Sequence, residues 1–139
     1  VFLLFMWFNT YGCEKMNVNE INAGILAYLG DSVYEVKIRE YLLKSKIGKA
    51  NVLNKEANKY VSAINQSKIL DSLLEKNIFD ENELYTINRG RNYKTHSKPK
   101  NSNIIDYKKA TALEALFGML YLKKDYERIN EIMKEILGA

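Results

Sequence analysis

The chain contains very little proline and glycine, the two residues that interrupt regular structure most strongly. Only one proline and seven glycines occur in 139 residues, whereas an all-β domain needs a turn signal every ~8–12 residues. The length of 139 residues fits one domain, since single domains typically run to ~100–200 residues. We therefore expect a single all-α domain.

Apolar residues recur at helical spacings of three and four along most of the chain. In the first stretch we expect Gly30 to interrupt or bend the helix, and Asp80 can cap a short third helix that ends near Gly90. The periodic apolar positions of the first stretch are Leu26, Leu29, Val33, Val36 and Leu43. The five main helices are expected at residues 21–43, 51–74, 80–90, 106–122 and 126–137.

The amino-terminal end has a different composition. Residues 1–8 are almost wholly apolar, but a spanning helix needs ~20 apolar residues and a secretory signal needs a preceding positive charge. We expect residues 1–20 to be an extension ahead of a domain at residues 21–139, with translation from Met16 as an alternative. Cys13 is the only cysteine, which excludes an intrachain disulfide and a cysteine-based metal site. A cytoplasmic protein without a membrane partner is expected.

Positive charge is concentrated between Arg89 and Lys109. This segment holds seven basic residues and one acid, a net charge of +6 in a chain of net charge +4, so the remainder sums to −2. Residues 90–103 include the only proline and lack an apolar period, which indicates an exposed loop. Such a loop can follow a phosphate backbone, and Tyr93 and His96 suit RNA, although a solvated loop is the alternative. The candidate RNA-binding residues are Arg89, Arg91, Asn92, Lys94, Lys98, Lys100 and Asn101.

Two acids stand in strongly apolar sequence, Asp31 in the first helix and Glu114 in the fourth. A charged group is costly there unless it is paired or binds a cation. Together they could hold Mg²⁺, with Mn²⁺ as an alternative, because these hard ions prefer oxygen ligands. Such a site suits phosphodiester hydrolysis. The residues alone leave two other readings open, Asp31 as a helix cap and Glu114 as the partner of a lysine or arginine.

Four motifs, in this order and at this spacing, resemble the ribonuclease III family in the form of its short bacterial members, the Mini-ribonuclease III group, which lacks a double-stranded-RNA-binding domain. The resemblance covers about residues 21–122. The motifs are LAYLGDSVYE at 26–35, VSA at 61–63 followed by Gln66, RGRN at 89–92 with PKN at 99–101, and TALEALFG at 111–118.

The resemblance implies a homodimer of helical subunits that cleaves double-stranded RNA and matures the large-subunit (23S) ribosomal RNA precursor. It assigns metal binding and catalysis to Asp31 and Glu114, and a dimer contact to Tyr28, for which core packing is the alternative. Full-length members carry two further acids where this chain has Ala27 and Thr111. Glu35, one turn beyond Asp31, becomes a candidate helper.

The leading hypothesis is a metal-dependent endoribonuclease. The first alternative is a non-catalytic RNA-binding dimer that assists ribosome assembly and has lost acids at positions 27 and 111. The second alternative is a helical protein-interaction module. Such a module would not bind RNA in a salt-dependent way, so the basic loop argues against it.

Overall fold

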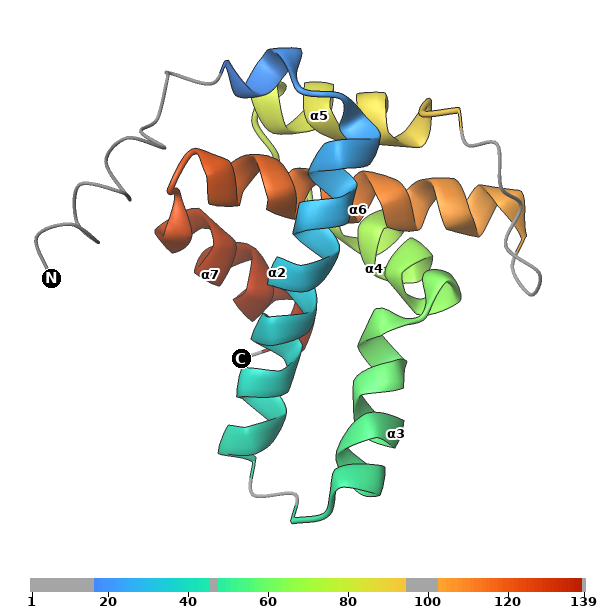
Figure 1. Cartoon of the computed structure of the whole chain (residues 1–139), viewed down its shortest axis with the longest axis vertical. Coiled ribbons are helices and arrows are strands. Elements are labelled where there is room, and N and C mark those ends of the chain that lie inside the picture. Colours follow the sequence, from blue (N-terminus) through green and yellow to red (C-terminus); the bar gives the residue numbers. More distant parts are fainter. Residues whose placement is uncertain (1–16, 46–47, 95–102, 139) are drawn as a thin grey trace, which may run out of the picture.

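The computed structural model describes residues 17–45, 48–94 and 103–138. Within these ranges every regular element is helical (Figure 1), which confirms the all-α prediction. The expected helices near 80–90, 106–122 and 126–137 are present with small shifts at their ends. The elements are the 3-10 helix η1 (Val18–Glu20) and the α-helices α2 (Ala23–Lys44), α3 (Ala50–Val61), α4 (Ala63–Glu75), α5 (Glu81–Arg91), α6 (Ile104–Leu122) and α7 (Tyr126–Leu137).

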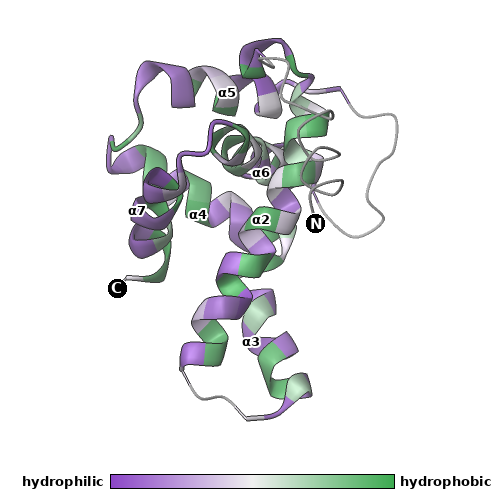
Figure 2. Ribbon diagram, turned by 60° about the vertical axis from the view of Figure 1, so that its left-hand side comes forward, coloured by the Kyte–Doolittle hydropathy of each residue, from purple (hydrophilic) through white to green (hydrophobic). Residues whose placement is uncertain are grey.

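Helix α6 lies at the centre of the molecule. It is crossed by α2, with α5 on one side and α4 and α7 on the other (Figure 1). In Figure 2 it is seen nearly end-on, with its hydrophobic ribbon surrounded by the other helices. From Ala110 to Leu120 every residue of α6 is buried except Glu114, which is partly exposed. A helix that is apolar all round belongs in a core, so the one acid in this stretch stands out.

Two glycines bring α2 and α6 together. A Cβ atom on Gly30 would lie 1.6 Å from the Glu114 backbone oxygen, and one on Gly118 would lie 2.0 Å from the Leu26 backbone oxygen. The backbones therefore approach more closely than any side chain allows. The expected interruption at Gly30 is wrong, because α2 continues unbroken from Ala23 to Lys44.

The face that α2 buries also differs from the expected stripe. Leu26 is buried, but Val36 and Leu43 are 53% and 66% exposed. The buried face instead comprises Ala23, Leu26, Ala27, Gly30, Tyr34, Ile38 and Leu42. This face contains small residues because a close helix crossing leaves no room for large ones.

The expected helix at 51–74 is two helices. Ser62 has an extended backbone (φ −67°, ψ 147°), ends α3 and caps α4 by accepting a hydrogen bond from the Asn65 backbone N–H. Serine is a favoured N-cap residue, so α4 can begin in a new direction.

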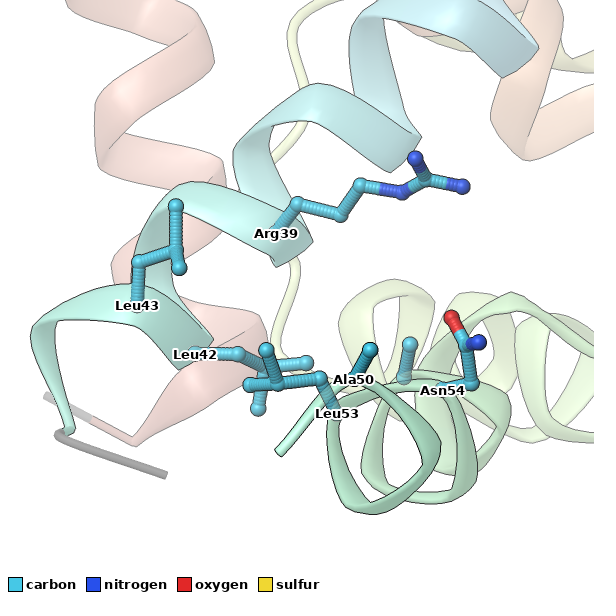
Figure 3. A pocket seen from close by; sticks show the side chains of 7 residues that line it. Arg39, Leu42, Leu43, Ala50, Leu53 and Asn54 are labelled. Atoms are coloured by element: carbon cyan, nitrogen blue, oxygen red, sulfur yellow. The ribbon is translucent and has the colours of Figure 1, made fainter. Parts of the chain in front are cut away.

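The α2–α3 hairpin extends away from the body of the molecule (Figures 1 and 2). Its far part encloses a small pocket in which Leu42 and Leu53 approach one another from the two helices (Figure 3). Nearer the body, the Tyr34 hydroxyl donates to the Tyr60 carbonyl at 2.9 Å, and the Tyr34 ring packs edge-on against Phe117 at 5.2 Å. These contacts fix the rotation of α2 and hence the direction of its residues one turn away, including Asp31.

Candidate active site

The α2–α6 crossing brings Asp31 and Glu114 together. Gly30, which precedes Asp31, lies directly against the backbone of Glu114. Asp31 lies in the interior of α2, whose N-cap is Asn22. The reading of Asp31 as a helix cap is therefore wrong. Glu114 forms no ion pair among the described residues, so the alternative of a lysine or arginine partner is not supported.

Both carboxyl groups hold their protons more tightly than usual. Burial, and then the neighbouring charge of Asp31, raise the pKa of Glu114 to about 8 from its ordinary value of 4.5. Burial, and then the charge of Glu35, raise the pKa of Asp31. Acids placed in this way repel one another when ionised, and a divalent cation between them would remove that repulsion.

The donor set fits a hydrated divalent cation. Within residues 17–45, 48–94 and 103–138, no three side chains from His, Cys, Asp and Glu gather closely enough to hold a metal. Two carboxylates are, however, sufficient for Mg²⁺, which keeps several waters and takes few protein ligands. Glu35 contributes its charge, but its carboxylate accepts a hydrogen bond from the guanidinium of Arg39 on the same helix.

Full-length family members carry acids at two positions where this chain has residues that pack in the core or form a hydrogen bond within their own helix. Ala27 is 5% exposed and packs in the core. Thr111 is 7% exposed, and its hydroxyl donates to the Tyr107 carbonyl at 3.0 Å. Neither residue offers a further ligand, so the site depends on Asp31 and Glu114.

Gln66 is a buried polar residue beside this pair. It lies in the first turn of α4, is 1% exposed, and acts on Glu114 by opposing the rise of its pKa. The sequence named Gln66 only as part of a motif and gave it no function. A neutral amide in an amphipathic helix carries no signal of its own.

The expected RNA-binding residues divide into three groups. Arg89 is partly buried, donates from its guanidinium to the Ile21 carbonyl, and lies 5.6 Å from the centre of the Tyr85 ring. Arg91 and Asn92 line a pocket at the junction of α5 and α6, and Lys94 is exposed. Lys98, Lys100 and Asn101 lie outside the described residues, as does His96.

Lysines at the start of α6 extend this basic surface. Lys108 and Lys109 line the same pocket as Arg91, and Lys109 also pairs with Asp71 of α4 at 2.7 Å. Both lysines contributed to the +6 charge of the segment but were not singled out as site residues. Their position in a helix, outside the expected loop, is the reason.

Tyr28 projects from α2 into solvent and is 84% exposed. Core packing within its own subunit is therefore wrong. On the same helix, a largely apolar pocket is lined by apolar residues of α2, α6 and α7 with three polar residues of α2 at its side: Leu29, Val33, Val36, Tyr121, Tyr126 and Ile129, with Ser32, Lys37 and Glu40. Among residues 17–45, 48–94 and 103–138, nothing covers this side chain and this pocket of α2.

An all-helical domain that holds two acids together beside a basic surface has the features of a helical nuclease. The Ribonuclease III domain model matches residues 25–125. The chain is 37% identical over 124 residues to Mini-ribonuclease 3 of Staphylococcus aureus, covering 89% of this chain and 92% of that protein. It is 45% identical over 117 residues to Mini-ribonuclease 3 of Brevibacillus brevis, with 84% and 86% covered. A crystal structure of a protein from Fusobacterium nucleatum superimposes with a TM-score of 0.74 at 34% identity, covering 86% of this chain and 93% of that one.

The chain therefore belongs to the ribonuclease III family, as its motifs indicated. It is an endoribonuclease that acts on double-stranded RNA. In the part of the chain that the structure describes, no helix has the length and hydrophobicity to cross a membrane.

Proposed function

We propose that this enzyme cleaves double-stranded RNA by metal-dependent hydrolysis at Asp31 and Glu114 and that it matures the large-subunit (23S) ribosomal RNA precursor. The observation that carries the first part is the meeting of these two acids, with raised pKa values, at the α2–α6 crossing. The cellular task rests on the similarity to Mini-ribonuclease 3 proteins. We further propose that residues 21–139 form the catalytic domain and that the enzyme acts in the cytoplasm.

In this proposal one group of residues holds the cation and another orients the RNA. A bound Mg²⁺ or Mn²⁺ supplies an activated water and neutralises charge that develops on the phosphate. Asp31 and Glu114 hold it, one from each of two helices whose crossing is fixed by Gly30. Arg91, Lys108 and the basic residues near them orient the duplex through its phosphates.

We also propose that the enzyme is a homodimer in which Tyr28 contacts the partner subunit. An exposed tyrosine and an apolar pocket on one surface are the components of a self-complementary contact. In a two-fold dimer each side chain can enter the pocket of the other subunit. The two strands of an RNA duplex are antiparallel, so two equivalent sites related by a two-fold axis can address one strand each.

The test is cleavage of a long RNA duplex in Mg²⁺ by the wild type and by Asp31→Asn and Glu114→Gln. We expect both variants to lose cleavage and to retain their circular dichroism and oligomeric state. Glu75→Gln is the matched control, because Glu75 is an exposed carboxylate on α4 with no ion pair among the described residues. Full activity of either site variant would refute the assignment. RNA binding without cleavage by the wild type, across several divalent metals, would instead indicate a non-catalytic RNA-binding dimer.

A further inference from the structure

Gln66 is a polar residue at a buried position of α4, where an apolar side chain is the usual choice. Its side chain is 1% exposed, and its Nε2 atom is buried without a hydrogen-bond partner that the described residues supply. A buried polar group without a partner costs ~1–3 kcal/mol. The other fully buried side chains of α4 on this side of the core include Leu70 and Leu73. Leucine would fill a core position without that penalty, so packing alone does not account for an amide here.

The neighbour of Gln66 across the α4–α6 contact is Glu114. The backbone of Gln66 is fixed, because its N–H donates to the Ser62 carbonyl at 2.8 Å in the first turn of α4. Its side chain lies close enough to Glu114 to favour the charged carboxylate. An amide N–H is a donor, and an ionised carboxylate is an acceptor with several lone pairs. Residues that donate to metal-ligating carboxylates fix their orientation.

We propose that Gln66 is a positioning residue whose side-chain N–H donates to one carboxylate oxygen of Glu114 and leaves the other oxygen turned toward Asp31 and the cation. This inference rests on the proposed metal site. With the cation held by one oxygen of Glu114, the other oxygen can accept the hydrogen bond from the buried Gln66 amide. Without the cation, Nε2 of Gln66 has no hydrogen-bond partner among the described residues, so cation binding that turns the carboxylate should change the environment of the amide.

The inference predicts that metal binding changes the environment of the Gln66 amide. Gln66 is the only glutamine in the chain, so labelling glutamine with ¹⁵N at the side chain gives one NH₂ signal in the NMR spectrum. We expect this signal to shift saturably as Mg²⁺ is added to the wild type and to stay in place in Asp31→Asn. A signal that does not move while the wild type binds Mg²⁺ would overturn the inference.

A variant measures the size of the effect. Gln66→Leu removes the amide at similar volume, and we expect Mn²⁺ affinity, measured by calorimetry without RNA, to fall by ~10–100-fold, the range for residues that support metal ligands. The apparent KM for RNA should stay the same while kcat at limiting Mn²⁺ falls. The matched control is Ser67→Ala, at the next residue of α4, which is 2% exposed, and it should bind Mn²⁺ as the wild type does.

The outcomes separate the two proposals. Unchanged Mn²⁺ affinity in Gln66→Leu, with or without lower stability, would assign Gln66 to packing and overturn this inference alone. A wild type that binds no divalent metal would overturn both this inference and the metal-dependent mechanism. If Gln66→Leu does not fold, the NMR titration of the wild type still decides.

Discussion

Substitution of Gly30 by alanine tests whether the α2–α6 crossing builds the active site. The added Cβ atom would lie 1.6 Å from the Glu114 backbone oxygen and 2.7 Å from the Gly118 backbone nitrogen. The first contact falls roughly 2 Å short of an ordinary separation of ~3.5 Å. Both neighbours are backbone atoms of a central helix and cannot rotate away, so α2 and α6 must separate. Overpacking of this kind costs ~1–3 kcal/mol or more, against a gain of ~1 kcal/mol for alanine over glycine in a helix.

The same separation moves Asp31 away from Glu114. A displacement of ~1 Å can reduce the rate of an enzyme by ~100-fold, so we expect Gly30→Ala to lower kcat by about that factor. Stability is measured by urea unfolding and activity by cleavage of an RNA duplex. Gly48→Ala is the matched control, because a Cβ atom there meets nothing within 4 Å. Wild-type stability and kcat in Gly30→Ala would refute the argument that this crossing positions the two acids.

Three further predictions follow from the charged groups. The metal-free protein should lose stability as the pH rises from about 5 to 8, because the raised pKa of Glu114 means that the folded state binds more protons than the unfolded state in that range, with a slope of up to ~1.4 kcal/mol per pH unit. Urea unfolding in EDTA should show this slope, Glu114→Gln should flatten it, and an equal slope in the variant would contradict the prediction. Glu83→Ala should cost ~3–5 kcal/mol, because Glu83 is 2% exposed and its carboxylate accepts from Arg128 Nε at 2.7 Å; a loss below ~1 kcal/mol in urea unfolding would argue against it. The double variant of Arg91→Ala and Lys108→Ala should weaken RNA binding and lower the slope of log affinity against log salt, while Lys76→Ala, distant on the α4–α7 contact and paired with Glu135, should leave the slope unchanged.

The sequence predicted best those helices that pack against the core through one apolar face. Helix α7 was expected at residues 126–137, and its apolar residues Ile129, Ile132 and Met133, which lie three and four residues apart, are buried. Large apolar side chains at helical spacing report burial reliably when they pack against other large side chains. The first helix did not follow this rule, because its buried face includes the small residues Ala23, Ala27 and Gly30 among the large apolar ones.

A prediction based on large apolar residues misses the small residues of such a face. It selected Val36 and Leu43, which are exposed on the hairpin. The break at Ser62 was missed for a related reason, since the apolar period continues through it and only the extended backbone of one residue separates α3 from α4. Both errors concern the path of the backbone, which apolar periodicity does not encode.

The candidate site was predicted through resemblance more than through physical pattern. Asp31 and Glu114 are more than 80 residues apart in the sequence, and only the fold shows that their helices cross. Their apolar surroundings indicated that a charge there is energetically costly, but they did not indicate which residue lies opposite. Gln66 gave no signal, because its function depends on the carboxylate across the α4–α6 contact.

The raised pKa values and the glycine crossing together would explain how the proposed site, with only two acids, could hold a cation. Burial and the neighbouring charge of Asp31 oppose the ionised form of Glu114, so the two acids would move apart if their backbones were free. Gly30 and Gly118 prevent that by locking α2 against α6, and the buried core around α6 supplies the stability that this arrangement requires. A cation would then meet two ligands that are already in place. Its binding displaces protons and releases the repulsion, so metal affinity should rise with pH, and it should fall when the crossing is loosened even though no ligand has been changed.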